Sequence, residues 1–523
     1  MSTKVDIAII GGGLNGLVTG AYLAKTGRSV TIFEQSDSVG GTMSTVEIGP
    51  GFRGPAALDS IDLVHPSIIE DLNLRQNGLR MIRGGGLILA SSSGRGLYLD
   101  SASSLSDQIA SFSQIDEKAF LELDAFLARI GKALDPVLTR PLKNPKTDGL
   151  SGAFDLMKVG WALRKLGQRE MPEALRFLPM TVQDVLDERF ESEYLKAMIA
   201  ATALKGSWLA PRSAGSAYGL LHHNPHWAKG LNRTTIFAEG GPGALSDAVA
   251  AAARSAGASI RTDARVTKII VEAGLCTGLT LESGEHIQAD RIISALDPRT
   301  TFESLTGQDW LDPDFMERVR QIRSHGSVAI VRLALDRAPQ FTCAPEGSES
   351  ISGRIQIGDS LQYIEKAFDA AKYGQIPDAP LLMASIPSIM DPTLAPTGKH
   401  VMIIWAATMP SQLREGNWDD EKEALGDRIV GILDQHAPGL RASVVHRQVE
   451  TPADLQKRFG LTNGCIYHVD LALDQLLYMR PIPGWFRYDT PIERLHLCGA
   501  GVHPGGAGTG LSGKCAAEHI ARL

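Results

Sequence analysis

A glycine-rich turn between a buried strand and a helix dominates the start of this chain. The apolar, β-branched run VDIAII at residues 5–10 leads into GGGLNG at residues 11–16, and residues 17–25 carry small and apolar side chains at helical spacing. A second strand signal, SVTIFE, follows at residues 29–34. This order is typical of the βαβ unit that binds dinucleotides, so the chain is predicted to contain a Rossmann-like domain.

The residues of this unit have separate expected roles. Gly11 permits a tight turn after the strand, Gly13 lets the backbone approach a pyrophosphate, and Gly16 lets the helix pack against the sheet. Glu34, at the end of the second strand, is expected to bind a pair of ribose hydroxyls. Together with Leu14 and Asn15, which open the helix, these residues form the predicted binding site for the first half of the cofactor.

Two further glycine clusters indicate which dinucleotide binds. Gly40 and Gly41 follow Glu34 by a short loop, and large flavoproteins use such a pair to bring a second backbone segment against the pyrophosphate of FAD. The run GTGLSG at residues 508–513 also matches the motif, but no second strand with an acidic residue at its end follows it in this sequence. Its helix N-terminus is suited instead to the electron-rich pyrimidine ring of a flavin. We therefore expect non-covalently bound FAD.

The composition fits a large globular α/β protein. With 523 residues, of which 43% are hydrophobic, the chain can form two or three domains. A formal net charge of −7, with the charges interspersed, argues against a nucleic-acid partner. The five cysteines are scattered and show no C-x-x-C spacing, so they predict neither disulfides nor a zinc site nor a redox-active dithiol.

The sequence also bears on location. The first strand begins near residue 5 and no run of about 20 apolar residues is present, so we expect a cytoplasmic protein without a leader peptide or a membrane-spanning helix. Residues 154–169 place four apolar side chains on one helical face and basic side chains elsewhere. A helix that covers the core is the first interpretation of this pattern, and peripheral membrane contact is the second.

Strand and helix signals place the domains in separated parts of the chain. Residues 239–256 combine a glycine-rich turn with an alanine-rich helix, and residues 260–294 read as a β-meander that returns to the first sheet. Residues 495–499 read as a closing strand. We assign residues 1–100, 236–300 and 486–523 to an FAD-binding domain, and the mostly helical residues 101–235 together with the strand-containing residues 301–485 to a substrate-binding domain.

Five segments of the chain point together to a family. They are IIGGGLNGL at 9–17, EGGPGAL at 239–245, IPSIMDPTLAPTGKH at 386–400, LDQLLYMRP at 473–481 and CGAGVHPGG at 498–506. In this order they resemble the phytoene-desaturase-related FAD oxidoreductases, most closely the branch named after pyridine nucleotide-disulfide oxidoreductase domain-containing protein 2. The resemblance implies an α/β fold with a Rossmann-like FAD domain and a mixed-sheet substrate domain with a helical cap, as in phytoene desaturases and amine oxidases.

The resemblance also implies where the cofactor lies. The ADP half would contact Gly11, Gly13, Gly16, Glu34, Gly40 and Gly41, with the backbone of Val266 at the adenine edge. The flavin half would contact Gly501, Val502, Gly510 and Leu511, with Pro55 and Ala56 at the other side of the ring. This chain has Thr42 where the family often has arginine, which leaves one phosphate contact open, and residues 506–513 depart from the family's usual GGGVSG.

The implied reaction is hydride transfer from a CH–CH bond of a hydrophobic or cyclic small molecule to N5 of the flavin. In phytoene desaturases this step needs little help from side chains, so a discrete catalytic base need not exist. His503, His468 and His223 are candidate bases because histidine titrates near neutrality, and each is also explained by a structural hydrogen bond. His222, His223 and His226 have no partner carboxylate in the sequence, so we expect no metal site.

Two other functions stay open at this point. An FAD amine oxidase would share the fold but oxidise CH–NH bonds. A non-enzymatic, escort-like binding protein would share the fold without needing flavin, although the intact glycine motifs at both ends argue against it. Oxygen, a quinone or another flavin are the candidate electron acceptors. The sequence indicates neither the substrate nor the oligomeric state.

Overall fold

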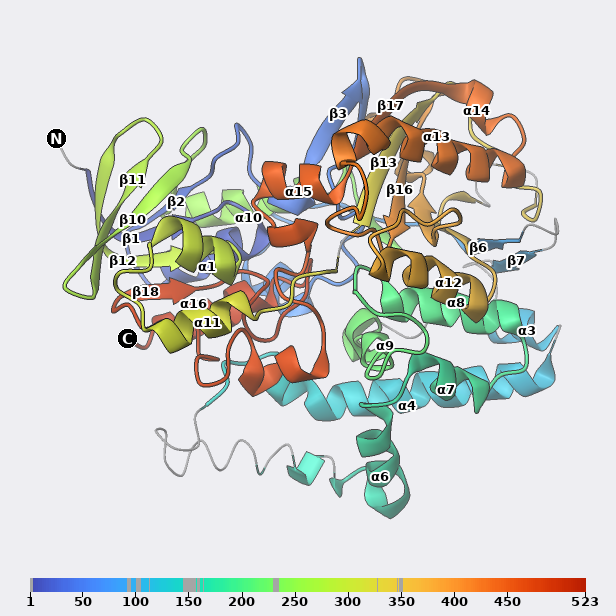
Figure 1. The fold of residues 1–523 in the computed structure, drawn as a ribbon, viewed down its shortest axis with the longest axis horizontal. Helices are drawn as coiled ribbons and strands as arrows, with labels where there is room; N and C mark the ends of the chain where they lie inside the picture. The colour runs from blue at the N-terminus through green and yellow to red at the C-terminus, as the bar shows by residue number, and fades with distance from the viewer. Residues whose placement is uncertain are drawn as a thin grey trace.

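The computed structural model describes residues 3–91, 96–99, 105–111, 113–143, 157, 160–162, 164–228, 235–326, 328–345, 347 and 351–523. Two large β-sheets stand side by side, each with helices packed on it, and a helical part lies below the second sheet in the view of Figure 1. The larger cluster of buried apolar side chains extends from the first sheet into the helical part. A smaller cluster lies on the far side of the second sheet.

The first sheet has the strand order β10-β11-β12-β1-β2-β9, with β18 paired to β12. β1 is parallel to β12 and β2, whereas β10, β11 and β12 form an antiparallel meander. The strands are β1 (Thr3–Ile10), β2 (Val30–Phe33), β9 (Ser259–Arg261), β10 (Val266–Glu272), β11 (Leu275–Leu281), β12 (His286–Ser294) and β18 (Leu495–Leu497). The strands predicted at residues 5–10, 29–34, 260–294 and 495–499 are confirmed, and three distant stretches of chain therefore build one sheet.

Three helices pack around this sheet: α1 (Leu14–Ala24), α10 (Gly243–Ser255) and α16 (Leu511–Ile520). α1 contacts both of the others, which explains why nearly all of its residues are buried. A Cβ on Gly513 would lie 2.3 Å from the backbone oxygen of Asn15. The absence of a side chain at Gly513 therefore lets α16 approach the start of α1.

The second sheet has the order β17-β13-β16-β15-β14-β6-β7. Its strands are β6 (Leu87–Ala90), β7 (Gly96–Leu99), β13 (Val328–Leu335), β14 (Arg354–Ile357), β15 (Leu382–Ser385), β16 (His400–Ala407) and β17 (Val444–Glu450). Ile355 and Ile404 point toward α13 (Trp418–His436), while Arg354 and Trp405 point to the opposite face. This alternation follows from the two-residue repeat of a strand.

The position of β6 and β7 differs from the expected domain division. Both strands fall within residues 1–100, which we assigned to the FAD-binding domain, yet they belong to the second sheet. The reason is that β6 pairs in parallel with β14, a strand more than 250 residues later in the chain. Such a long-range pairing leaves no local signal in the sequence.

The helical part contains α3 (Leu105–Ala110), α4 (Gln114–Leu138), α6 (Gly167–Phe177), α7 (Val182–Asp187), α8 (Glu193–Leu204) and α9 (Tyr218–His223), with α12 (Leu361–Lys372) packed against α8. Of the basic amphipathic segment predicted at residues 154–169, residues 154–156, 158, 159 and 163 lie outside the described residues. Within the described ranges, no helix has the length and apolar character needed to cross a bilayer. The remaining elements are β3 (Thr45–Gly49), β4 (Phe52–Pro55), β5 (Met81–Arg83), β8 (Ile236–Ala238), α2 (Pro66–Asp71), α11 (Pro313–Arg320), α14 (Leu440–Ser443) and α15 (Pro452–Phe459).

Candidate functional site

The turn between β1 and α1 presents bare backbone to a cleft. Gly11 has a φ of +98°, and a Cβ on Gly16 would lie 2.1 Å from the carbonyl oxygen of Gly11, so neither position accepts a side chain without strain. A Cβ on Gly13, by contrast, would meet no atom within 4 Å. Gly13 is the N-cap of α1 and contributes no capping side chain. The first amides of α1 thus face open space that suits an anion.

Glu34 lies immediately beyond β2 and is almost fully buried, with 6% of its surface exposed. Its Oε2 accepts a hydrogen bond from the backbone amide of Gly12 at 2.7 Å, and its Oε1 accepts one from the amide of Ser36 at 2.9 Å. Both contacts hold the carboxylate at the edge of the same cleft. An ionised carboxylate held in this way is a strong acceptor for hydroxyl groups.

The cleft contains about 980 Å³ of space not filled by atoms, its open mouth included. Nine residues predicted from the sequence line it: Gly11, Gly13, Leu14, Asn15, Gly16, Glu34, Gly41, Thr42 and Val266. Gly40 lies just behind, where its amide donates to the carbonyl oxygen of Gly12 at 2.9 Å.

The other predicted cofactor residues lie around the far end of the cleft. Gly501, Val502, Gly510 and Leu511 are not part of its lining, but Ala500, Ala507 and Gly508 of the same loop are. The lining also includes Gly460, Leu461 and Ile466, which the sequence analysis missed. These residues come from the range assigned to the substrate domain. The one local signal was Gly460, which ends α15 with a φ of +68°.

The loop with Pro55 and Ala56 is fixed by a fully buried arginine of the second sheet. Arg332 on β13 donates from Nε to the carbonyl oxygen of Pro55 at 2.7 Å and from Nη2 to that of Ala56. Glu450 pairs with the same Nη2 at 2.5 Å. The indole of Trp405 donates to the carbonyl oxygen of Ala57 at 2.7 Å. The second sheet therefore determines where this loop stands.

A second buried arginine fixes the C-terminal loop. Arg480 donates to backbone carbonyl oxygens of residues that precede it and follow it in the chain, including Tyr467 at 3.0 Å and Ala500 at 2.8 Å. A Cβ on Gly505 would lie 2.5 Å from Nε of Arg480, and a Cβ on Gly506 would lie 2.1 Å from Cε1 of His222. The loop, whose sequence differs from the family's usual GGGVSG, thus packs closely against the side chains of Arg480 and His222.

The structure places the three candidate bases in different surroundings. His468 lines the cleft, and its Nδ1 is buried without a hydrogen-bond partner among the described residues. His503 is fully buried, with Nε2 at 2.8 Å from the carbonyl oxygen of Val137. His223 has Nε2 at 3.0 Å from the carbonyl oxygen of Lys205. Of the three, His468 alone lines the described cleft.

Burial lowers the pKa of His468 and of His503 to about 4, since a charged imidazole loses its hydration there. At neutral pH both rings are therefore neutral. A neutral His468 carries a lone pair on one ring nitrogen and an N–H on the other. It is a weak base, because its conjugate acid is fully dissociated at pH 7.

Stability should therefore fall as the pH drops from about 6.5 to about 4. Burial lowers the pKa of His222, like those of His468 and His503, to about 4, while the unfolded chain binds these protons at the ordinary pKa of 6.5. The unfolded state then holds more protons in this window, and each histidine lowers the free energy of unfolding by about 1.4 kcal/mol per pH unit. Urea unfolding at pH 7, 6 and 5 measures the effect.

The variant H222N is the control for this pH dependence. Other partly buried histidines, such as His400 and His436, also have a lowered pKa, so the total slope is a sum. The difference between the wild type and H222N isolates one of the three groups. Equal slopes for both proteins would contradict the buried, neutral state of His222.

The cleft fits a flavin dinucleotide in two independent respects. The open space next to Gly13 would be filled by a Cβ, as expected where a phosphate group approaches the backbone. At the other end, the unpartnered Nδ1 of His468 lacks the partner that nearly all buried polar atoms have. Gly13 and His468 line the same cleft, as expected for a long ligand that carries phosphates at one end and a polar ring at the other.

Comparison with known proteins places these features in context. Residues 9–62 match the model of the NAD(P)-binding Rossmann-like domain, and residues 170–521 match that of the flavin containing amine oxidoreductases. The chain is 35% identical to pyridine nucleotide-disulfide oxidoreductase domain-containing protein 2 of Rattus norvegicus, over 100% of this chain and 94% of that protein. It is 23% identical to a lycopene-forming phytoene desaturase of a Paracoccus species, over 97% and 95% of the two chains.

Among solved structures, putrescine oxidase bound to putrescine superimposes with a TM-score of 0.61 at 15% identity, covering 100% of this chain and 99% of that one. This likeness concerns the fold. The predicted α/β architecture is confirmed, and so is the resemblance to the phytoene-desaturase-related proteins and to the branch named above.

Proposed function

Because the chain belongs to the flavin containing amine oxidoreductase family, we propose that it binds FAD non-covalently and oxidises a CH–CH bond of a hydrophobic or cyclic small molecule. Membership of this family makes the chain a flavin-dependent oxidoreductase. The dinucleotide form of the flavin is supported by the bare backbone at Gly13 and by Glu34 at the ribose position of the cleft. The open space at Gly13 is the observation that carries the proposal.

The residues of this chain have defined tasks in such a reaction. The amides at the start of α1 bind the pyrophosphate, Glu34 binds ribose hydroxyls, and the loop at Ala500–Gly508 contacts the ring end of the cofactor. When bound, the flavin supplies hydride acceptance. Buried side chains such as Tyr467 and Leu58 surround this end of the cleft and exclude water.

We propose that the bond oxidised is CH–CH rather than CH–NH. Phytoene desaturase, a relative over nearly its whole length, acts by its name as a desaturase. The likeness to putrescine oxidase supports the alternative reaction only through the fold. Oxygen consumption in the presence of a panel of amines tests the alternative. The main proposal is tested by reduction of a quinone analogue in the presence of carbonyl or hydrocarbon compounds that contain a saturated CH–CH bond. Rapid peroxide formation with an amine would contradict the CH–CH assignment.

Neutralising Glu34 should weaken FAD binding without unfolding the protein. In the variant E34Q the side chain keeps its shape but loses the charge that strengthens a hydrogen bond to a ribose hydroxyl, and its NH2 replaces one of the two oxygens that accept from the amides of Gly12 and Ser36. We expect the dissociation constant of FAD to rise by about 10-fold, the effect of one such bond, about 1.4 kcal/mol. Titration of the flavin-free protein with FAD measures it.

The exposed Asp37 in the next loop gives the matched control, D37N, because its side chain does not line the cleft. FAD should bind D37N as it binds the wild type. Equal FAD affinity of E34Q and the wild type would show that Glu34 does not contact the ribose.

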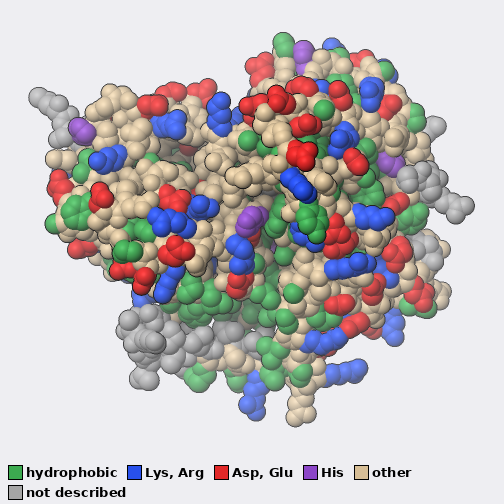
Figure 2. All heavy atoms as spheres, in the orientation of Figure 1, with side chains coloured by type: hydrophobic (Ala, Val, Ile, Leu, Met, Phe, Trp, Pro, Cys, Tyr) green, Lys and Arg blue, Asp and Glu red, His purple; other side chains and the backbone are tan. Residues whose placement is uncertain are grey.

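We further propose that the protein contacts membranes peripherally and passes electrons to oxygen or a quinone. Around α6 the structure exposes Trp161, Leu175 and Met157, and Nζ of Lys165 lies 3.8 Å from the centre of the Trp161 ring. Figure 2 shows hydrophobic and basic side chains exposed at the lower edge of the molecule, where Figure 1 places α6. Apolar side chains with basic neighbours are typical of interfacial segments.

The membrane proposal predicts binding to anionic vesicles. The wild type should co-sediment with phosphatidylglycerol vesicles at low salt, and the variant W161E should lose at least half of this binding because a carboxylate replaces the apolar ring. A substitution at another exposed aromatic side chain, Y373E, is the control and should bind as the wild type does. Failure of the wild type to co-sediment would contradict the proposal.

A further inference from the structure

A second cavity lies between α8 and the second sheet. It contains about 450 Å³ of space not filled by atoms, its open mouth included. Its walls come from β6, β14, β15 and β16 on one side and from α8 on the other. Apolar side chains such as Leu87, Met383 and Ala201 line much of it, and the ring of Trp405 forms one wall.

Four charged side chains lie in or beside this apolar cavity. Lys205 follows α8 and places Nζ 3.4 Å from Oδ1 of Asp59 and 4.8 Å from the centre of the Trp405 ring. Arg354 on β14 places Nη2 3.2 Å from Oδ2 of Asp62. Lys205 and Asp59 are largely buried, with 15% and 10% of their side chains exposed. Buried charges of this kind need hydrogen-bond partners to be stable.

The hydrogen bonds leave donors in excess of acceptors. Asp59 is fully used, since Oδ1 faces Lys205 and Oδ2 accepts from the hydroxyl of Ser385 at 2.8 Å. An ammonium has three N–H donors, and Lys205 uses one of them on Asp59. In Arg354, Nε is buried and has no partner in the part of the chain that the structure describes. The cavity therefore presents free N–H groups to an acceptor.

The ionisation of Lys205 and Asp59 agrees with this arrangement. Burial lowers the pKa of the Lys205 ammonium, and the nearby Asp59 opposes the shift. The pKa of Asp59 is itself lowered, because the attraction of Lys205 and Arg354 outweighs the effect of burial. Asp59 is therefore ionised at neutral pH, so it accepts hydrogen bonds from its neighbours and donates none. The donors of this cluster are therefore the nitrogen atoms of Lys205 and Arg354.

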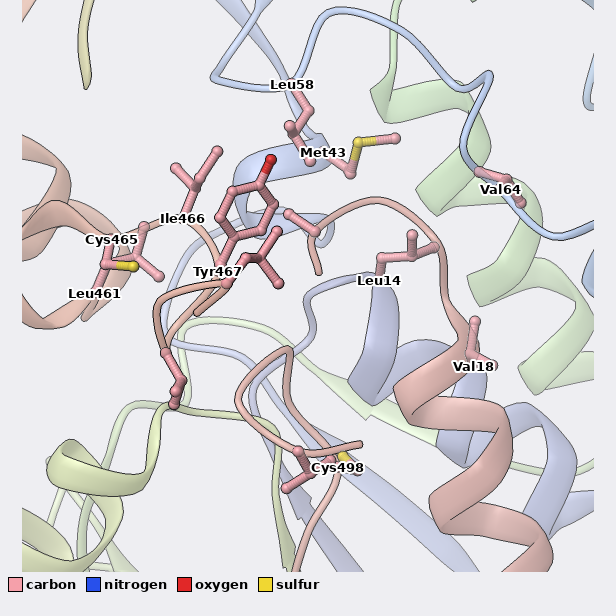
Figure 3. Packing of buried hydrophobic residues seen from close by; sticks show 14 of the residues in the cluster. Leu14, Val18, Met43, Leu58, Val64, Leu461, Cys465, Ile466, Tyr467 and Cys498 are labelled. Atoms are coloured by element: carbon pink, nitrogen blue, oxygen red, sulfur yellow. The ribbon is translucent and has the colours of Figure 1, made fainter. Parts of the chain in front are cut away.

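The cavity adjoins the cofactor cleft through direct contacts. The hydroxyl of Tyr467 donates to the carbonyl oxygen of Lys205 at 2.8 Å, and the next residue, His468, lines the cleft. Figure 3 shows the ring of Tyr467 pointing toward Met43 and Leu58, and Leu58 belongs to the loop that carries Asp59. On that side, Trp405 binds the backbone of the loop that carries Asp59. These hydrogen bonds thus connect residues in the walls of the two cavities.

We propose that this cavity is the substrate site, and that Lys205, with Arg354 beside it, binds a carbonyl or carboxylate oxygen of a compact, otherwise apolar substrate. The assignment rests on the proposed function and specifies its substrate class. A carbonyl oxygen satisfies the free donors, whereas a protonated amine brings further N–H groups to a place that already has too many. A substrate that carries a carbonyl or carboxylate group favours oxidation of a CH–CH bond next to that group, rather than oxidation of an amine.

Three probes of equal ring size test the assignment: cyclohexanecarboxylate, cyclohexanone and cyclohexylamine. Each is titrated into the flavin-loaded protein by calorimetry, with the flavin absorbance followed in parallel. We expect the carboxylate or the ketone to bind at least 10-fold more tightly than the amine. Preference for the amine, or equal affinity for all three, would overturn the assignment while leaving flavin binding and the proposed function intact.

Variants of Lys205 identify the residue responsible. K205M should weaken binding of the preferred oxygen probe at least 10-fold, and K205R should restore part of it. The matched control is K196M on the same helix, because Lys196 pairs with Asp187 and Glu193 and does not line the cavity. Unchanged probe affinity in K205M, with flavin content and melting temperature as in the wild type, would overturn the role of Lys205.

A second variant decides the matter if K205M fails to fold. D59N removes the carboxylate that shares the ammonium, so cyclohexanecarboxylate should bind several-fold more tightly than to the wild type. Unchanged or weaker binding would count against the assignment. If the protein retains no flavin, the proposed function fails, whereas the calorimetric titration still shows whether the cavity prefers an oxygen group.

Discussion

Replacing Gly13 by aspartate should abolish flavin retention while leaving the fold intact. A Cβ at this position meets no atom within 4 Å, so the new side chain has room in the flavin-free protein. In the flavin-bound protein the same carboxylate would occupy the space of the pyrophosphate and repel its charge. We expect FAD affinity to fall by at least about 100-fold, or about 2.7 kcal/mol. FAD titration and the thermal melting temperature of the flavin-free protein measure the two effects.

A graded series provides the control for Gly13. G13A adds a single methyl group without charge, so its FAD affinity should lie between those of the wild type and G13D. The melting temperatures of all three flavin-free proteins should agree within a few degrees. If G13D binds FAD as the wild type does, the phosphates do not lie at the start of α1.

Replacing Arg480 by methionine should strongly destabilise the protein. Arg480 is fully buried and donates to the carbonyl oxygens of Tyr467, Val469, Asp470, Gln475 and Ala500. These hydrogen bonds tie the segment around His468, residues 467–475, to the C-terminal loop at Ala500. Without the guanidinium, several buried carbonyl groups lose their donors, so we expect the free energy of unfolding to fall by about 4 kcal/mol. Urea unfolding of the flavin-loaded protein is the measurement.

The control for Arg480 is a neighbouring surface arginine. Arg323 pairs with Asp474 at 2.6 Å, but 44% of its side chain is exposed. Because exposed ion pairs contribute little, R323M should lower the free energy of unfolding by less than about 1 kcal/mol. A loss in R480M as small as that in R323M would mean that the buried guanidinium does not hold the two segments together.

The first half of the cofactor cleft could be predicted from the sequence because its requirements are local. The spacing of Gly11, Gly13 and Gly16 encodes a turn and a close approach, and Glu34 follows from the length of one helix and one strand. The structure places all four residues on one cleft. The strands of the first sheet were equally predictable, since apolar β-branched runs are a local signal.

The remainder of the site depends on contacts between distant parts of the chain. Arg332 and Arg480 are ordinary arginines in the sequence, and only the folded chain shows them buried beside the two loops. Lys205 and Asp59 lie 146 residues apart, and neither belongs to a recognisable motif. Gly460 and Ile466 reach the cleft from the range assigned to the substrate domain. Spacing alone carries no information about such pairings.

The absorption spectrum of the purified protein tests the central claim most directly. We expect flavin bands in the visible region, and release of FAD, in roughly equimolar amount to the chain, when the protein is denatured without proteolysis. Photoreduction under anaerobic conditions should bleach these bands, and their slow return in air would agree with a quinone as acceptor. A protein without flavin bands, even after incubation with excess FAD, would contradict the assignment of the cleft.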